Sequence, residues 1–235
     1  MAITQDQLTL GTNYSAASSS TIALTTTGAV ASGGFIVLGV YWFTYNNVTL
    51  NSVSGGSLTW TVDKQFQSGG SVNAALVSAQ APSGLASSTS ITATFSSSIP
   101  TFKGICGASW TGVATPTVID GTPGTSSGSA AAWTAGSIST SNANDLVVGA
   151  CTGDASGSFS STPTGGWTEN NDFSDSTDGD SGTQVYQIVS STGAYNPGGT
   201  WSTSVSFSGV SVAYQAAATA AAAAVPFLHR MPLGV

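Results

Sequence analysis

The chain has 235 residues, of which 6% are charged and 40% hydrophobic, and its formal net charge is −7. Three basic residues cannot displace many phosphate counterions or hold an anionic lipid surface, and no stretch approaches the roughly 18 apolar residues of a membrane-spanning helix. We therefore expect neither nucleic acid nor a membrane as a partner. Ser, Thr, Val and Gly dominate where charged helix formers are scarce, which predicts an all-β protein.

Residues 1–20 are predicted to be a polar N-terminal arm ending in the serine-rich SAASSS. The arm lacks a basic region followed by a long apolar stretch, so no secretory signal is expected. A protein with the composition of an extracellular β-protein then needs another route out of the cell. Release on a virus particle is one route, and a leader that is cleaved or absent from this sequence is another.

Residues 21–215 are predicted to form a β-sandwich of two similar four-stranded halves, about 21–117 and 131–215. WTVDKQF at Trp60 returns as WTENNDF at Trp167, and TTTGAVASGGFIVLG is matched by GSISTSNANDLVVGA. AALVSAQAPSG is answered by TQVYQIVSSTG, and TATFSS by SVSFSG. A period of about one hundred residues is too long for a solenoid and suits two halves of one structure. The fold class expected is an antiparallel, jelly-roll-like sandwich.

The densest aromatic run is Tyr41, Trp42, Phe43 and Tyr45. In a strand, Trp42 points to the face opposite the other three. One face is expected in the core, and the other is a candidate platform on which a sugar ring stacks, although aromatic residues are also common in sandwich cores.

Cys106 and Cys151 each lie in an apolar, strand-like run. Burial as small hydrophobic residues is the favoured interpretation, and a disulfide is the alternative. No further soft ligand accompanies them, so no zinc or iron site is expected.

Half of the acids gather in one short segment, as Glu169, Asp172, Asp175, Asp178 and Asp180. A solvated hairpin loop is the favoured interpretation. The last three could surround calcium, but their spacing departs from the usual calcium loop. Glu169 with a nearby aspartate is the weakest of our hypotheses, a glycosidase pair, because such carboxylates must face each other across a cleft.

The residues from 216 to 235 are expected to form an alanine-rich C-terminal arm. Its nine-residue alanine tract is too short for a stable isolated helix, and prolines stop its continuation. The residues predicted to dock this arm on its own sandwich or on a neighbouring subunit are Pro226, Phe227, Leu228, Met231 and Leu233. A disordered end is the alternative.

The only histidine, His229, lies in that arm, so a catalytic triad would have to include a residue of the C-terminal arm. Phosphate-binding and dinucleotide motifs are absent. We therefore expect no enzyme activity, no cofactor and no metal.

The order TTTGAV, GGFIVLGV, LTWTVD, ASWTGV, TSNANDLVVGA, GGWTENND, YQIVSSTGAY and VSVAYQAAA resembles a jelly-roll-like module. Such modules occur in bacteriophage virion proteins and some secreted bacterial proteins, and the resemblance covers about residues 20 to 218. The resemblance implies a sandwich that is displayed on a surface or used for adhesion, and it supplies no family active site. The expected function is that of a non-enzymatic virion protein, associated with the head or the tail. Its expected partners are its own copies and other virion proteins, with host surface glycans as a further possibility. The alternative is a carbohydrate-binding module of a secreted or adhesion protein.

Overall fold

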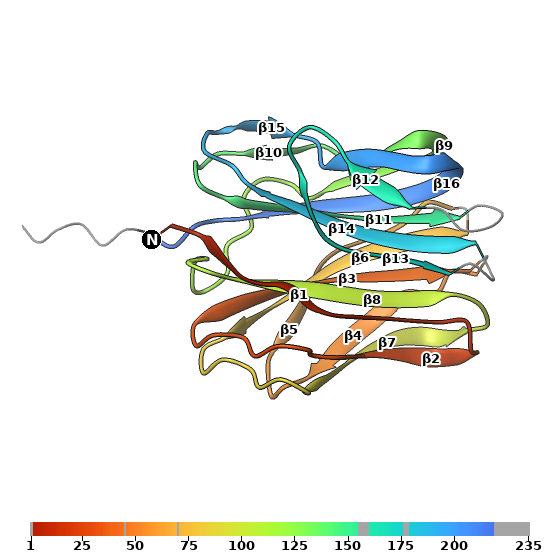
Figure 1. Ribbon diagram of the computed structural model, residues 1–235, viewed down its shortest axis with the longest axis horizontal. Coiled ribbons are helices and arrows are strands. Elements are labelled where there is room, and N and C mark those ends of the chain that lie inside the picture. The colour runs from red at the N-terminus through yellow and green to blue at the C-terminus, as the bar shows by residue number, and fades with distance from the viewer. Residues whose placement is uncertain (1, 45, 70, 155–159, 176–178, 219–235) are drawn as a thin grey trace, which may run out of the picture.

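The computed structural model describes residues 2–218, apart from 45, 70, 155–159 and 176–178. Every regular element among these residues is a β-strand, all strand pairs are antiparallel, and no helix is present in this part of the chain. The prediction of an antiparallel all-β protein is therefore confirmed. Figure 1 shows the strands stacked in layers, with the first half of the chain below the second.

A five-stranded sheet runs through the middle of the stack in the order β1-β8-β3-β6-β5. Its strands are β1 (Thr4–Ser15), β3 (Gly34–Phe43), β5 (Trp60–Gln67), β6 (Val72–Ala81) and β8 (Lys103–Thr111). The apolar runs of β3, β6 and β8 are buried on both faces, whereas β1 and β5 lie at the edges and are partly exposed. Strands covered on both sides are expected to be apolar throughout, as these are.

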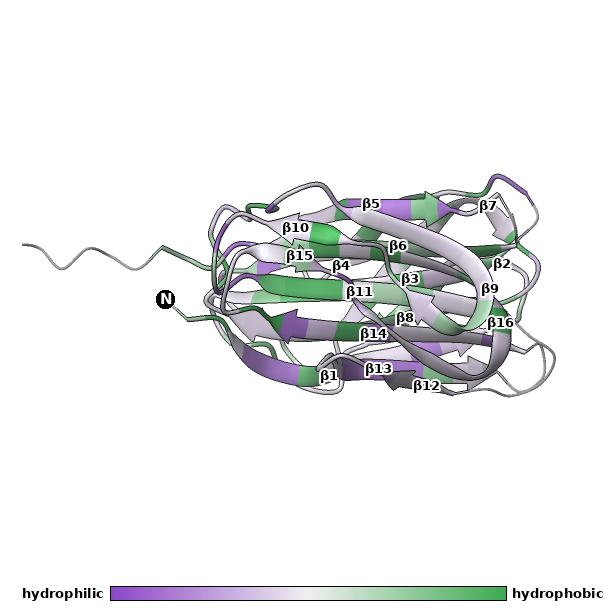
Figure 2. Ribbon diagram, turned by 90° about the horizontal axis from the view of Figure 1, so that it is seen from above, coloured by the Kyte–Doolittle hydropathy of each residue, from purple (hydrophilic) through white to green (hydrophobic). Residues whose placement is uncertain are grey.

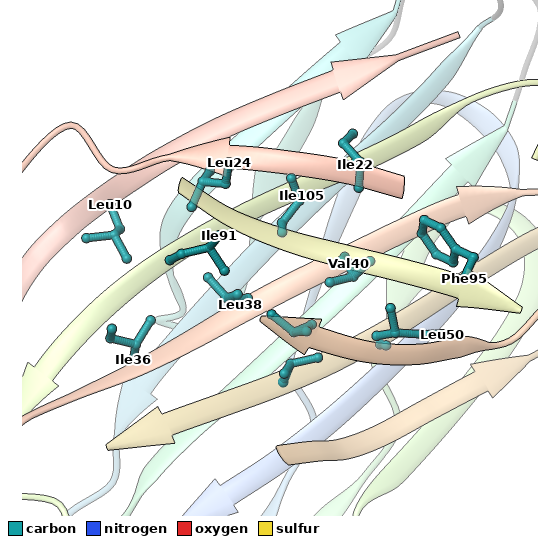
Figure 3. Close-up of a cluster of buried hydrophobic side chains, with 14 of the residues drawn as sticks. Leu10, Ile22, Leu24, Ile36, Leu38, Val40, Leu50, Ile91, Phe95 and Ile105 are labelled. Carbon is teal, nitrogen blue, oxygen red and sulfur yellow. The ribbon is translucent and has the colours of Figure 1, made fainter. Parts of the chain in front are cut away.

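One face of this sheet packs against a three-stranded sheet of order β2-β7-β4. Its strands are β2 (Ser19–Thr25), β4 (Leu50–Gly55) and β7 (Ser90–Ile99). Figure 3 shows the side chains between the two sheets, among them Leu24 and Ile91 from one and Leu38 from the other.

The opposite face packs against a six-stranded sheet in the order β12-β16-β11-β14-β13, with β9 also paired to β16. Its strands are β9 (Gly124–Thr134), β11 (Leu146–Asp154), β12 (Ser161–Pro163), β13 (Thr168–Asp175), β14 (Asp180–Ile188) and β16 (Gly198–Tyr214). A small sheet of β10 (Ile138–Thr140) and β15 (Gly193–Tyr195) covers part of its outer face. Figure 2 shows the central strand β11 as mostly hydrophobic, with hydrophilic stretches on the outer strands β5 and β13.

Strand β3 supplies side chains to both interfaces by simple alternation. Phe35, Val37 and Tyr41 belong to the core shared with the six-stranded sheet. Ile36 and Trp42 belong to the core shared with the three-stranded sheet. An apolar run without polar interruption therefore marks a strand with a layer on each side.

Polar groups also join the two large sheets. The Tyr41 hydroxyl donates to the Thr183 carbonyl at 2.9 Å, and the Thr152 hydroxyl donates to the Asn73 carbonyl at 2.8 Å. The Asn171 side-chain amide donates to the Gly107 carbonyl at 3.1 Å. Because these groups are buried, each bond satisfies a donor that would otherwise be costly to desolvate.

The pairing pattern is nested in each half of the chain. In the first half β1 pairs with β8, β2 with β7 and β3 with β6. In the second half β9 pairs with β16, β10 with β15 and β11 with β14. The edge strands β5 and β13 each contain a bulge, between Val62 and Lys64 and between Glu169 and Asn171.

The N-terminal segment, expected as an arm through residue 20, contains strand β1 and the start of β2. Residues 4–15 pair with β8, and Leu10 is fully buried among the apolar side chains of the first half. This part of the segment is therefore an edge strand of the five-stranded sheet.

Candidate functional site

An open groove of about 700 Å³ lies beside strands β5 and β6. This volume falls within the range of small-molecule sites. Its wall comes from the turn before β5, the end of β6 and the segment that leads to β9. The lining residues are Gly56, Ser57, Leu58, Thr59, Thr61, Asp63, Ser78, Ala79, Gln80, Pro82, Ser83, Gly84, Pro116, Thr117 and Ile119.

A tight turn shapes the groove on the side of β5. Gly56 has a φ of 65°, a backbone conformation that favours glycine, and a Cβ atom there would lie 2.4 Å from Leu85 Cδ1. The amide N–H of Leu58 donates to the Gly55 carbonyl and closes the turn. The indole N–H of Trp60 donates to the same carbonyl at 3.1 Å, which fixes the start of β5.

The opposite wall is held by Gln80 at the end of β6. Its side-chain amide donates to the Ala114 carbonyl at 2.9 Å and to the Thr117 hydroxyl at 3.0 Å. These bonds attach the segment around residues 114–117 to the five-stranded sheet. The position of this wall of the groove is therefore fixed by the fold.

Asp63 supplies the carboxyl group of the groove lining and sits at the bulge of β5. The Tyr214 hydroxyl, at the end of β16, donates to Asp63 Oδ2 at 2.7 Å. Burial raises the pKa of Asp63, and hydrogen bonds from Tyr214 and Ser78 partly offset that rise. Burial also raises the pKa of Tyr214 well above its usual value, so this tyrosine acts as a hydrogen-bond donor rather than as a base.

The groove therefore offers a hydrogen-bonding surface of hydroxyls, an amide and one carboxyl, with apolar patches at Leu58 and Ile119. Hydrolysis of a glycosidic bond needs two opposed carboxyl groups, and the lining contains one. Such a surface suits binding of a neutral, hydroxyl-rich molecule.

The aromatic run lies elsewhere. The side chains of Tyr41 and Trp42 have no exposed surface, and Phe43 is half-buried against the core between the large sheets. Tyr41 and Trp42 therefore provide no platform for a sugar ring. Tyr45 lies outside the described residues.

The acidic segment forms much of strand β13, at the edge of the six-stranded sheet. Glu169 accepts a hydrogen bond from the Thr183 hydroxyl at 2.9 Å, while burial raises its pKa and the charge of Asp172 adds to the rise. Asp180 begins β14 and is buried. Asp178 and the side chain of Asp175 lie outside the described part of the structure, so the calcium hypothesis for this segment stays a prediction.

The two cysteines are free and buried, in agreement with the first of the two interpretations. The predicted docking residues Pro226, Phe227, Leu228, Met231 and Leu233 lie beyond residue 218, outside the described residues.

Sequence reasoning did not single out Asp63 or Tyr214. Asp63 stands inside the repeated WTVDKQF segment, and Tyr214 ends the strand-like VSVAY. A signal was present in the scarcity of acids, because an acid within a strand-like segment of so poorly charged a chain is unusual.

Within the described ranges, no three His, Cys, Asp or Glu side chains are grouped to hold a metal ion. No helix there is long and apolar enough to cross a membrane. None of the protein-family models, curated proteins or solved structures with which the chain was compared matches it.

Proposed function

We propose that the protein is a non-enzymatic structural component of a bacteriophage particle, located on the head surface or with the tail. It assembles with its own copies and with other virion proteins, and the C-terminal arm of residues 216–235 helps to attach it. The observation that carries the proposal is the long, uncharged edge strand β9, which suits pairing with a second copy.

We further propose that the chain consists of two jelly rolls in tandem. A jelly roll is a long hairpin rolled into two sheets, so its strands pair first with last and second with second-last. The nested pairs of β1 to β8 and of β9 to β16 support this assignment. The bulges also support it, because Asp63 and Asn170 occupy the same position in the repeated WTVDKQF and WTENNDF segments. Jelly rolls are used in viral capsids and in lectins, which correspond to the two candidate functions of this chain.

Strand β9 has the sequence GTSSGSAAAWT and pairs with β16 as its one partner among the described residues. Most of its side chains are exposed. The other long edge strands β1, β5 and β13 each contain charged residues, which oppose edge-to-edge pairing, whereas β9 contains none. Two β9 strands related by a two-fold axis can therefore extend the six-stranded sheet across a dimer.

We expect Ser129→Lys to raise the dissociation constant of the homo-oligomer by at least about tenfold. The two-fold axis would bring each new charge towards its counterpart, and like charges across an interface are costly. Ser129 is exposed and its partner on β16 is Ser206, so the fold itself should tolerate the change. Sedimentation equilibrium over a range of protein concentrations measures the effect.

A matched control is Thr12→Lys, which places the same charge at an exposed position of edge strand β1. It should leave the dissociation constant unchanged. A wild-type protein that is monomeric at every concentration, or equal effects of the two lysines, would contradict pairing through β9.

Location on a particle is tested directly. Particles of the phage that encodes this chain should contain it in a fixed ratio to the major capsid protein by quantitative mass spectrometry. Immunogold labelling should place it at the head or at the tail. Its absence from purified particles, although the protein is produced during infection, would refute the virion assignment.

The groove favours a second candidate function, the binding of a carbohydrate. Thr61 is exposed at the groove, and its replacement by Trp would fill the space beside Asp63. If the protein is a lectin-like module, glycan arrays should give a specific signal with wild type that Thr61→Trp reduces by about tenfold or more, equivalent to about 1.4 kcal/mol.

The matched control for this experiment is Thr168→Trp, at the exposed counterpart position on β13. It should bind as wild type does. No specific glycan signal, or a signal that Thr61→Trp leaves intact, removes the groove as a carbohydrate site and leaves the structural proposal standing.

A further inference from the structure

A pair of buried aspartates lies outside the groove lining, where the chain enters its second half. Asp120 precedes β9, and Asp145 directly precedes β11; the two side chains are 4% and 0% exposed. The amide N–H of Val189 donates to the Asp145 carbonyl and fixes the backbone at this point. The amide N–H of Asp120 donates to the Ala213 carbonyl on β16. Both aspartates are thus held by the six-stranded sheet.

The carboxylate of Asp120 is fully occupied by donors from one turn. The backbone N–H and hydroxyl of Ser141 donate to its two oxygens, each at 2.6 Å. The backbone N–H and side-chain amide of Asn142 donate at 2.9 and 3.2 Å. Burial opposes ionisation of Asp120, but hydrogen bonds from Asp145, Ser141 and Asn142 together hold its pKa below the ordinary range. Asp120 is therefore a fixed negative charge.

Asp145 is in the opposite situation. Both of its carboxyl oxygens are buried, and neither accepts a hydrogen bond of good geometry. Its polar neighbours are the carboxyl of Asp120 and the backbone N–H of Ala216. No basic side chain acts on either aspartate within the described part of the chain. Asp145 avoids the like charge of Asp120 either by holding a proton, which it donates to Asp120, or by binding a cation in place of that proton.

Asp145 also lines a cavity of about 430 Å³. Asn142, Asn144 and residues 215–218 are among the other residues of its wall. Carboxylate, side-chain amide and main-chain carbonyl oxygens are the ligands that Ca²⁺ takes in flexible sites, with water completing the shell. Mg²⁺ demands a stricter octahedron and is less suited to an open cavity of this kind.

We propose that this cavity binds a calcium ion, with the Asp145 carboxylate as its charged ligand. Asp120 does not line the cavity but adds its negative charge next to Asp145. Oxygen atoms of the 142–144 turn and of residues 215–218 complete the site together with water. The ion joins the turn before β11 to the point where the C-terminal arm leaves the sheet. This inference is independent of the proposed function.

The test is thermal unfolding of the full chain at about pH 8, with and without about 10 mM CaCl₂. For a site with a Kd of about 10⁻⁴–10⁻³ M, the midpoint should rise by about 3–10 °C. Asp145→Asn should abolish the rise, because the amide keeps the shape but loses the charge. MgCl₂ at the same concentration should give a smaller rise with wild type.

Asp172→Asn is the matched control, since it removes one negative charge from an exposed position of the acidic strand β13. It should respond to calcium as wild type does. A calcium effect lost in Asp172→Asn and retained in Asp145→Asn would overturn the proposal and favour the acidic segment, and so would no calcium effect on wild type.

Hydrogen exchange of the wild-type protein keeps the proposal testable should Asp145→Asn fail to fold. Calcium should slow amide exchange at residues 142–146 and 215–218. Unchanged exchange there, or protection confined to 169–180, would contradict the site.

Discussion

Replacement of Trp42 by alanine is expected to lower the free energy of unfolding by about 3–5 kcal/mol, the usual cost of truncating a buried aromatic residue. The ring has no exposed surface and packs at 5.4 Å between centroids from Phe95, in the core between the five- and three-stranded sheets. Its indole N–H donates to the Val48 carbonyl at 2.9 Å. Thermal unfolding followed by circular dichroism should show a midpoint about 6–20 °C below wild type.

Trp42→Phe separates packing from the hydrogen bond. It keeps most of the apolar volume and removes one of two donors to the Val48 carbonyl, because the Gln67 side-chain amide also donates to it. The lost hydrogen bond should therefore cost about 0.5–1.5 kcal/mol. Wild-type stability of Trp42→Ala would place this side chain outside the core. The prediction also affects the interpretation of carbohydrate binding. Because Trp42 is buried, a loss of glycan binding in Trp42→Ala would result from unfolding and not from the loss of a surface on which a sugar ring stacks.

Replacement of Phe173 by alanine is the second change with a large expected effect. This ring comes from β13 and lies between the two large sheets, 5.3 Å from Tyr41 and 5.7 Å from Phe102 between centroids. Glycines face it from both sheets, since a Cβ at Gly104 or Gly182 would lie within 2.4 Å of its Cζ atom. Truncation leaves a cavity that these backbones cannot readily fill, so we expect a loss of about 3–5 kcal/mol in urea-induced unfolding.

Phe66→Ala is the natural comparison, because Phe66 occupies the matching place in the repeated segment on β5. It is only half-buried, so its truncation should cost about 1–2 kcal/mol. Equal losses for Phe66→Ala and Phe173→Ala would show that Phe173 has no special role between the sheets.

Much of the strand content could be predicted from the sequence, because alternation and apolar runs are local properties. The run GFIVLGVYWF forms β3, the segment WTVDKQF lies in edge strand β5, and TENNDF of the second segment lies in edge strand β13. The number of layers could not be predicted. The apolar run around Trp42 does not say which strands cover its second face, and in the folded chain the three-stranded sheet covers it.

The residues of the groove and of the aspartate pair were beyond sequence reasoning for a related reason. Asp63 meets Tyr214 across 151 positions of the chain, and Asp120 meets the turn at Ser141 and Asn142 through strand pairing. Each acid by itself resembles an ordinary turn or strand residue. Only the nested pairing of distant strands brings it to its partner.

The burial of β3, β8 and β11 on both faces has a consequence for how this protein can change during evolution. A substitution in these strands must fit two neighbouring layers at once, so volume-conserving exchanges are the ones tolerated. Divergence is thereby directed to the outer strands and connecting loops, which meet the surroundings. A scaffold of this kind can present a rapidly varying exterior over an interior that scarcely alters.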